Sequence, residues 1–293
     1  MHARERTSIR AVLQGIESVG DDMTTGAGEF DGRTVMVTGG STLLGHGVVR
    51  VLQAAGATIA IVDIDDAGAK AIVDELQNNV RFYRTDITND VDVAETIAAI
   101  DADGRGLYGL VNLACSYVDD GVDSTRAQWL EALNVNLVST AMVTQQARPY
   151  LRKTGGAVVN FTSVSSKVAQ TGRWVYPASK AALVQLTRSM AMDLAGDGIR
   201  INSVSPGWTW SKIMDQRSGG DRTMIDNLAA PLHLTRRTCD PEEVGSVVAY
   251  LLSPRASAVT GADWAVDGGY SAMGPEQAVP AVPQPTEQVP RRD

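Results

Sequence analysis

Short apolar segments rich in β-branched residues recur along the chain, and amphipathic stretches separate them. Helical periodicity predicts helices at residues 45–55, 66–77, 90–100, 126–152, 175–195 and 241–253. Apolar runs predict strands at residues 34–38, 58–63, 81–84, 107–113, 157–163, 200–204 and 263–266. Strands alternating with helices indicate right-handed βαβ crossovers. We therefore expect an α/β fold: one doubly wound, seven-stranded parallel sheet with helices on both faces.

The first thirty residues form a predicted N-terminal extension. Apolar residues recur there at helical spacing, which predicts one short helix; they are Ile9, Val12, Leu13 and Ile16. Two explanations of the extension remain open. Either it reflects the choice of start codon, since Met23 precedes the expected domain, or its helix docks on a neighbouring subunit.

Residues 31–273 form the predicted catalytic domain. Within it, residues 208–240 lack strong periodicity and are expected to be a substrate lid. Residues 274–293 are rich in proline, a composition that cannot build a packed core, so we expect an extended tail there.

Charge and composition limit the classes of partner that we expect for this protein. A net charge of −8 and a pI near 5.0 argue against nucleic acid, because phosphate binding needs a basic surface. We expect no membrane partner either, since every apolar run is shorter than the ~18 residues of a spanning helix. Cys115 and Cys239 lack metal-ligand spacing and form no disulfide framework. With no secretory signal, these features predict a metal-free cytoplasmic protein.

The first predicted strand runs into a glycine-rich turn, Thr38 to Gly45, followed at once by a helix. Backbone N–H groups and the positive end of a helix at such a turn bind a dinucleotide pyrophosphate, as in Rossmann-type domains. The candidate contacts in this turn are Gly39, Ser41, Thr42, Leu43 and Leu44.

The second predicted strand ends in Asp63. A carboxylate there accepts the ribose hydroxyl hydrogens of NAD and repels the 2′-phosphate of NADP. No Arg or Lys lies at positions 38–45 or 63–69, so we expect NAD(H) as the cofactor. The alternative is that Asp63 only caps the next helix.

Tyr176 and Lys180 carry the candidate chemistry. Their i, i+4 spacing places them on one face of a helix, and Ser163 closes a predicted strand thirteen residues before Tyr176. A phenol with its ordinary pKa of ~10 is a poor base at neutral pH. We expect the Lys180 ammonium, helped by a positive nicotinamide, to lower the pKa of Tyr176. Tyr176 is then the acid/base and Ser163 holds the substrate oxygen.

Taken together, these motifs resemble the single-domain Tyr-Lys-Ser branch of the short-chain dehydrogenases/reductases over about residues 31–270. The matching positions are Thr38, Gly39, Gly45, Asp63, Asp86, Asn112, Asn136, Ser163, Tyr176, Lys180, Pro206, Gly207, Asp267, Gly268 and Gly269.

The resemblance implies further roles. Asp86 and Ile87 would hold the adenine, and Asn136 would anchor a water that reaches Lys180, as a fourth catalytic residue. Pro206 and Gly207 would pass beside the nicotinamide. Further cofactor contacts implied are Ile64, Asn112, Ala114, Thr209 and, near the carboxamide, Ser211, besides Tyr176 and Lys180 themselves. The resemblance also implies a homotetramer or homodimer, built on helices 126–152 and 175–195.

Two positions depart from the family pattern. Leu43 (or Thr42, in another spacing) stands where a middle glycine is usual, which adds bulk near the pyrophosphate. Cys115 replaces a glycine that normally lies under the cofactor. Either it narrows the site or it is simply a small packed thiol.

The candidate substrate residues are Cys115, Trp174, Trp208, Trp210 and Met214. Aromatic rings around the expected site suggest an apolar or cyclic substrate. The alternative is that the rings pack the lid or a subunit contact. Three basic residues of the lid could meet a substrate anion, although a solvated loop face is the expected role; they are His233, Arg236 and Arg237.

The leading hypothesis is NAD(H)-dependent hydride transfer between a nicotinamide and a secondary alcohol or ketone. One alternative keeps the fold but performs a non-redox step: cyclisation, dehydration or epimerisation. Another is a cofactor-bound interaction protein, against which the Ser163–Tyr176–Lys180 set argues.

Overall fold

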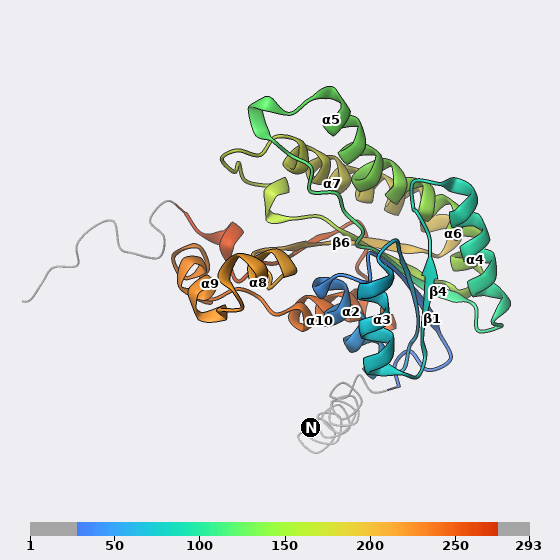
Figure 1. Ribbon diagram of the computed structural model, residues 1–293. Helices are drawn as coiled ribbons and strands as arrows, with labels where there is room; N and C mark the ends of the chain where they lie inside the picture. The colour runs from blue at the N-terminus through green and yellow to red at the C-terminus, as the bar shows by residue number, and fades with distance from the viewer. Residues whose placement is uncertain (1–27, 275–293) are drawn as a thin grey trace, which may run out of the picture.

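The computed structural model describes residues 28–274, and a parallel sheet runs through their centre (Figure 1). The strand order is β3-β2-β1-β4-β5-β6-β7. The strands are β1 Thr34–Thr38, β2 Thr58–Asp63, β3 Val80–Arg84, β4 Leu107–Asn112, β5 Ala157–Phe161, β6 Arg200–Pro206 and β7 Asp263–Val266. The predicted fold class is confirmed. The predicted helix in the N-terminal extension and nearly all of the proline-rich tail lie outside the described residues.

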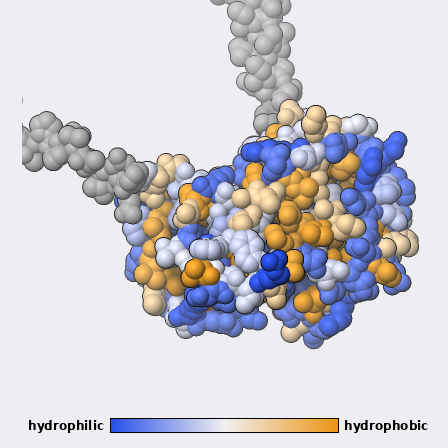
Figure 2. Space-filling view, turned by 90° about the horizontal axis from the view of Figure 1, so that it is seen from above, coloured by the Kyte–Doolittle hydropathy of each residue, from blue (hydrophilic) through white to orange (hydrophobic). Residues whose placement is uncertain are grey.

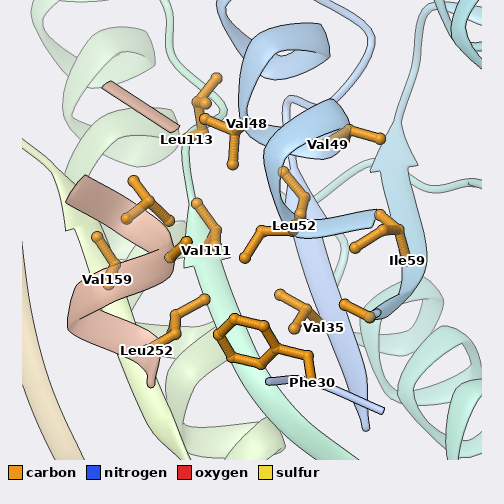
Figure 3. Close-up of a cluster of buried hydrophobic side chains, with 14 of the residues drawn as sticks. Phe30, Val35, Val48, Val49, Leu52, Ile59, Val111, Leu113, Val159 and Leu252 are labelled. Carbon is orange, nitrogen blue, oxygen red and sulfur yellow. The ribbon is translucent and has the colours of Figure 1, made fainter. Parts of the chain in front are cut away.

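Helices cover both faces of the sheet (Figure 1). One layer holds α2 Leu43–Ala54, α3 Asp66–Leu76 and α10 Pro241–Leu252. The other holds α4 Asp90–Ala102, α6 Ser139–Thr154 and α7 Val175–Leu194. The side-chain alternation of strands builds two cores: in β1, Val35 and Val37 pack toward α2 and α10, whereas Met36 packs toward α4 and α6. Figure 3 shows the first core, in which Phe30 lies below Leu52 and Leu252.

Two glycines let α2 and α10 pack closely. A Cβ at Gly47 would lie 2.3 Å from Pro241 Cβ, and a Cβ at Gly245 would lie 2.9 Å from the Gly47 carbonyl oxygen. Pro241 occupies the first turn of α10, and Asp240 and Glu243 form a capping box at its start. The close crossing holds α2, with the glycine-rich turn at its start, against α10.

Two predicted elements that bear on the site are wrong in detail, and the lid contains helices that the sequence analysis did not specify. The helix expected at 126–152 is α5 Arg126–Leu133, a π-helical turn η3 Asn134–Val138 and then α6. The lid holds two short helices, α8 Lys212–Ser218 and α9 Arg222–Ala229, which begin at the N-caps Ser211 and Asp221. They are too short for a clear periodic signal. Finally, β5 ends at Phe161, so Ser163 lies beyond the strand.

The strand order reverses between β1 and β4, which are neighbours although β2 and β3 separate them in sequence. Ligands of open α/β sheets bind beyond the carboxyl ends of the strands at such a switch point. The candidate site residues meet there. Among residues 28–274, no helix combines the length and apolar character needed to cross a membrane.

Candidate active site and cofactor site

The glycine-rich turn needs glycine at two positions. Gly39 has φ +72°, and a Cβ there would lie 2.6 Å from the backbone nitrogen of Ala114 at the end of β4. A Cβ at Gly45 would lie 2.5 Å from the Gly39 carbonyl oxygen. Thr42 caps α2: its Oγ1 accepts from Gly45 N at 3.0 Å. The turn therefore packs closely against the segment that follows β4 and against the start of α2.

This turn carries polar groups without protein partners. Ser41 Oγ is buried and has no hydrogen-bond partner within residues 28–274. The N–H groups of Leu43 and Leu44, in the first turn of α2, likewise find no acceptor in the described part of the chain. Free donors at a helix N-terminus fit a phosphate group. The turn therefore fits a dinucleotide pyrophosphate, with the half-buried Leu43 side chain beside it.

The carboxylate of Asp63 faces the same turn. Its Oδ2 accepts from Ser41 N at 3.0 Å, and its Oδ1 accepts from Ile64 N at 2.7 Å and Asp65 N at 3.1 Å. The cap of α3 is Asp65, whose side chain accepts from Ala67 N and Gly68 N. Asp63 is therefore not the helix cap, and that alternative is wrong. Its position at the end of β2 suits ribose hydroxyls.

A cation that sequence inspection overlooked lies beside Asp63. Arg84 ends β3 and is paired in register with Asp63. Its guanidinium donates to Ile64 O at 3.1 Å and forms an ion pair with Asp66. Only the pairing of β2 with β3 reveals this neighbour, because Arg84 is distant from the turn in sequence.

The residues expected around the adenine and nicotinamide lie at the same end of the sheet. Asp86 Oδ1 accepts from Thr88 N at 2.9 Å, which closes a turn after β3, and Ile87 beside it is half-buried. The Asn112 side chain points into the interior, where its Nδ2 donates to Thr144 and Asn160. Its amide nitrogen is thus already engaged within the protein.

Beyond β6, the chain turns closely past β7. A Cβ at Gly207, which follows Pro206, would lie 2.8 Å from Asp267 Cα. Thr209 is buried and bridges to Cys239, so the two ends of the lid are joined at its base. Ser211 Oγ accepts from Met214 N at 3.4 Å and caps α8.

The three candidate catalytic residues are buried together. Ser163, Tyr176 and Lys180 are 8%, 7% and 3% exposed. Lys180 Nζ donates to Phe161 O at 2.8 Å and lies 5.6 Å from the centre of the Tyr176 ring. One turn of α7 therefore presents the phenol and the ammonium on the same face, beside the end of β5.

The surroundings raise the pKa of Tyr176 above its ordinary value. Burial is the largest cause, and Cys115 adds to it, while the Ser163 hydroxyl and the Arg173 guanidinium act in the opposite direction. The predicted lowering of this pKa included a bound nicotinamide and stays a prediction; in the chain by itself the pKa is raised. The Lys180 ammonium donates to the Phe161 carbonyl. The cost of charging a buried phenol outweighs the effects that lower the pKa of Tyr176.

Ser163 is oriented by a chain of polar groups. Its Oγ accepts from Ser165 N at 3.1 Å and lies 3.2 Å from Ser165 Oγ, which in turn contacts Gln170 Oε1 at 2.7 Å. The Ser163 hydroxyl is thus held by Ser165, and it also interacts with the Tyr176 phenol.

Asn136 clamps the loop after β4. Its Oδ1 accepts from Ser116 N at 2.7 Å, and its Nδ2 donates to Ser116 O at 3.0 Å and Ser179 Oγ at 3.1 Å. The π-helical turn that contains Asn136 places this side chain between the loop and α7. The implied water relay to Lys180 stays a prediction.

Two residues near Tyr176 were missed in the sequence. Asp119 accepts from the backbone N–H groups of Gly121, Trp174 and Tyr176 at 2.9–3.0 Å, so it ties the β4 loop to the start of α7. Tyr117 stacks on Tyr176 with ring centres 5.2 Å apart. Neither position carries a motif, and only the meeting of two loops reveals them.

The tryptophans and basic residues of the lid have different roles. Trp208 contacts His233 edge-on, and Trp210 lies under the Arg222 guanidinium, so both rings have packing partners in the lid. Trp174, at the start of α7 and two residues before Tyr176, is 54% exposed. Met214 is half-buried in α8.

The expectation of a solvated loop face is wrong for His233. That ring is 1% exposed: Nδ1 donates to Ala229 O at 3.0 Å, and Nε2 accepts from Trp208 N at 3.3 Å. Arg236 donates to Ala230 O, and Arg237 pairs with Glu243.

Cys115 contributes a protonated thiol to the site. Burial raises its pKa, and the nearby Lys180 ammonium only partly offsets this effect. Both cysteines of the chain are free. In the described part of the chain, no group of His, Cys, Asp and Glu side chains is arranged to hold a metal ion.

Comparison with known proteins identifies the family. Residues 41–271 match the family model described as enoyl-(acyl carrier protein) reductase. The chain is 31% identical over 250 residues to a 2,5-dichloro-2,5-cyclohexadiene-1,4-diol dehydrogenase of Sphingobium indicum, covering 84% of this chain and 99% of the relative. It belongs to the short-chain dehydrogenases/reductases. This short-chain dehydrogenase/reductase is therefore an oxidoreductase of CH–OH groups.

Two further proteins are similar over most of their length. An L-fucose dehydrogenase of Bos taurus is 33% identical over 248 residues, covering 82% of this chain and 90% of the relative. A solved structure of a putative gluconate dehydrogenase from Agrobacterium tumefaciens has a TM-score of 0.77 at 28% identity, covering 83% of this chain and 98% of that one. The short-chain dehydrogenase/reductase described here thus has the family fold over nearly the full length of its relatives.

Proposed function

We propose that the protein is an NAD(H)-dependent dehydrogenase that interconverts a secondary alcohol and a ketone on an apolar or cyclic substrate. The observation that carries the proposal is the burial of Ser163, Tyr176 and Lys180 in one cluster beside a phosphate-fitting turn. Relatives named for a cyclohexadiene diol and for L-fucose support a cyclic substrate.

The chain's own residues manage the proton and the orientation of the substrate. In the oxidation direction, the Tyr176 phenolate takes the hydroxyl proton, and Ser163 holds the oxygen as it becomes a carbonyl. Lys180 and the nearby Arg173 provide the positive charge that favours the phenolate. A bound NAD⁺ would supply the acceptor for the hydride of the carbinol carbon.

The preference for NAD is supported by Asp63. Its carboxylate accepts backbone N–H groups of the turn and stays available for ribose hydroxyls. A 2′-phosphate at this place would meet the negative charge of the carboxylate. The Arg84 guanidinium already pairs with Asp66, which supports the same preference.

We also propose a cytoplasmic homotetramer. The free thiols Cys115 and Cys239 suit a reducing compartment. Figure 2, which looks down on the side of α5 and α7, shows apolar residues gathered on that face. Exposed apolar side chains on these helices and on the turn between α5 and α6 are Leu130, Val138 and Met192.

Tyr176→Phe tests the reaction. Incubation of the full chain with NAD⁺ and a panel of cyclic diols, sugars and acyclic secondary alcohols is expected to raise the absorbance of reduced nicotinamide. The variant should lose about a hundredfold or more in kcat, the usual contribution of general acid–base catalysis. Tyr150→Phe, on the outer helix α6, is the matched control and should retain activity. Full turnover by Tyr176→Phe, or NAD⁺ binding without reduction by any alcohol, contradicts the proposal.

A further inference from the structure

A second tyrosine covers the catalytic one. The rings of Tyr117 and Tyr176 stack with their centres 5.2 Å apart and their planes 22° apart. Tyr117 is 55% exposed, whereas Tyr176 is 7% exposed, so Tyr117 lies on the solvent side of the pair. Offset stacking of two aromatic rings contributes about 0.5–1.5 kcal/mol beyond area burial. The stack therefore restrains the catalytic ring and excludes water from one of its faces.

The loop that carries Tyr117 is fixed on both sides. Before it, both backbone polar groups of Ser116 are bonded to the Asn136 amide. After it, Asp119 accepts from the backbone N–H of Tyr176 itself, at 2.9 Å. Only Tyr117 and Val118 span the two anchors. The position of the Tyr117 ring is thus set by the same residues that hold the start of α7.

Several polar groups face the Tyr176 phenol. Lys180 and Arg173, from α7 and the segment before it, each lie 5.6 Å from the ring centre. Cys115 approaches from the β4 loop. The Ser163 and Tyr117 hydroxyls both favour the charged form of Tyr176 and so lower its pKa, against the larger raising effect of burial.

We propose that Tyr117 is a positioning residue for Tyr176: its ring holds the catalytic ring in place, and its hydroxyl donates to the phenolate oxygen. The assignment rests on the proposed role of Tyr176 as acid/base. In the oxidation direction the substrate proton passes to Tyr176, while Tyr117 keeps its own proton throughout. Tyr117 thereby offsets part of the cost of charging a buried phenol.

Two substitutions separate the ring from the hydroxyl. Tyr117→Phe keeps the stack, so we expect an unchanged fold and KM and a kcat for alcohol oxidation about three- to tenfold lower at neutral pH. The low-pH limb of kcat/KM, where Tyr176 must lose its proton to act as a base, should shift to higher pH by about half to one unit. Tyr117→Leu removes the stack as well and should lose more activity. Tyr150→Phe again serves as control. A pH profile of Tyr117→Phe identical to wild type overturns the proposal, as does a change confined to KM, which would mark a substrate contact instead.

A readout without turnover separates this inference from the proposed reaction. In protein labelled with fluorotyrosine, the resonance of Tyr176 is assigned by its absence in Tyr176→Phe and then titrated with pH. Loss of the Tyr117 hydroxyl should move its midpoint to higher pH. If Tyr117→Phe shifts the titration midpoint of Tyr176 but the protein oxidises no alcohol, the proposed function is rejected and the effect of Tyr117 on Tyr176 still holds. An unshifted midpoint in an active enzyme rejects only the role of Tyr117.

Discussion

At the scale of single residues, the proposed preference for NAD depends on the charge at the end of β2. The Asp63 carboxylate anchors the turn through Ser41 N, and in the proposed function it would also present negative charge to the ribose. Asn at this position removes the charge and keeps one acceptor oxygen, so it can retain the contact with Ser41 N or the contacts with Ile64 N and Asp65 N. The substitution removes the charge while keeping part of the anchoring.

We expect Asp63→Asn to lower the preference for NAD over NADP by about tenfold or more, which corresponds to ~1.4 kcal/mol. Part of the gained NADP affinity should come from Arg84, which lies beside residue 63 in the paired strand. The double variant Asp63→Asn/Arg84→Gln should therefore bind NADP more weakly than Asp63→Asn alone. Kd values from quenching of protein fluorescence measure both effects. Asp74→Asn, on the exposed face of α3, is the control; equal cofactor preference in wild type and Asp63→Asn would refute the role of the charge.

The sequence was sufficient to find residues whose type and spacing follow a known rule. It was not sufficient to find residues whose role depends only on which segments meet in the fold. Gly39 was readable because a glycine between a strand and a helix start permits the tight turn of a dinucleotide site; the structure adds that a Cβ there would lie 2.6 Å from the backbone nitrogen of Ala114. Tyr176 and Lys180 were readable because a helix brings i and i+4 together. Tyr117 and Asp119 had no such rule, because their partners lie on α7, more than fifty positions away. The raised pKa of Tyr176 in the chain by itself was not readable from the sequence, because burial depends on the whole fold.

At the scale of elements, strands were predictable and short helices were not. β1, β2 and β7 have the predicted bounds, because each is a short apolar run that ends at a polar or turn residue. The π-helical turn at Asn134–Val138 differs from an α-helix only in its hydrogen bonds, which leaves little mark on periodicity. It nevertheless positions Asn136 against Ser116.

The crossing of α2 and α10 gives a prediction at the same scale. Gly47→Ala should destabilise the protein by about 1–3 kcal/mol, because the added Cβ would overlap Pro241 and force the helices apart. For a domain of this size, this corresponds to a lower Tm by several degrees, at ~2–4 °C per kcal/mol. Gly196→Ala, where a Cβ meets nothing within 4 Å, is the control and should leave Tm unchanged or slightly raised. Differential scanning calorimetry compares them; an unchanged Tm for Gly47→Ala would show that the crossing relaxes freely.

At the scale of the whole molecule, helices α5 and α7 and the turn between α5 and α6 expose large apolar side chains. Leu130 on α5 and Met192 on α7 are 62% and 82% exposed, and Val138 lies between α5 and α6. Leu130, Leu133 and Val138 line a shallow groove of about 550 Å³. Burying such residues against a second copy contributes about 25 cal/mol of favourable free energy per Å² of apolar surface removed from water. A two-fold arrangement would bring the same helices of both copies together and would bury the apolar side chains of both copies in one interface.

Charge placed on this face should therefore break the assembly while leaving each subunit folded. We expect wild type to run as a tetramer in light scattering, and Leu130→Glu/Met192→Glu to run as a smaller species. Glutamates facing each other across a two-fold axis repel, and their burial is costly. Val91→Glu, an equally exposed apolar position on α4, should leave the tetramer intact. A monomeric wild type, or a tetramer that survives the double variant, would exclude this face as the interface. Because Tyr176 and Lys180 lie on the same helix as Met192, the dissociated variant also shows whether α7 keeps its catalytic geometry without a neighbouring subunit.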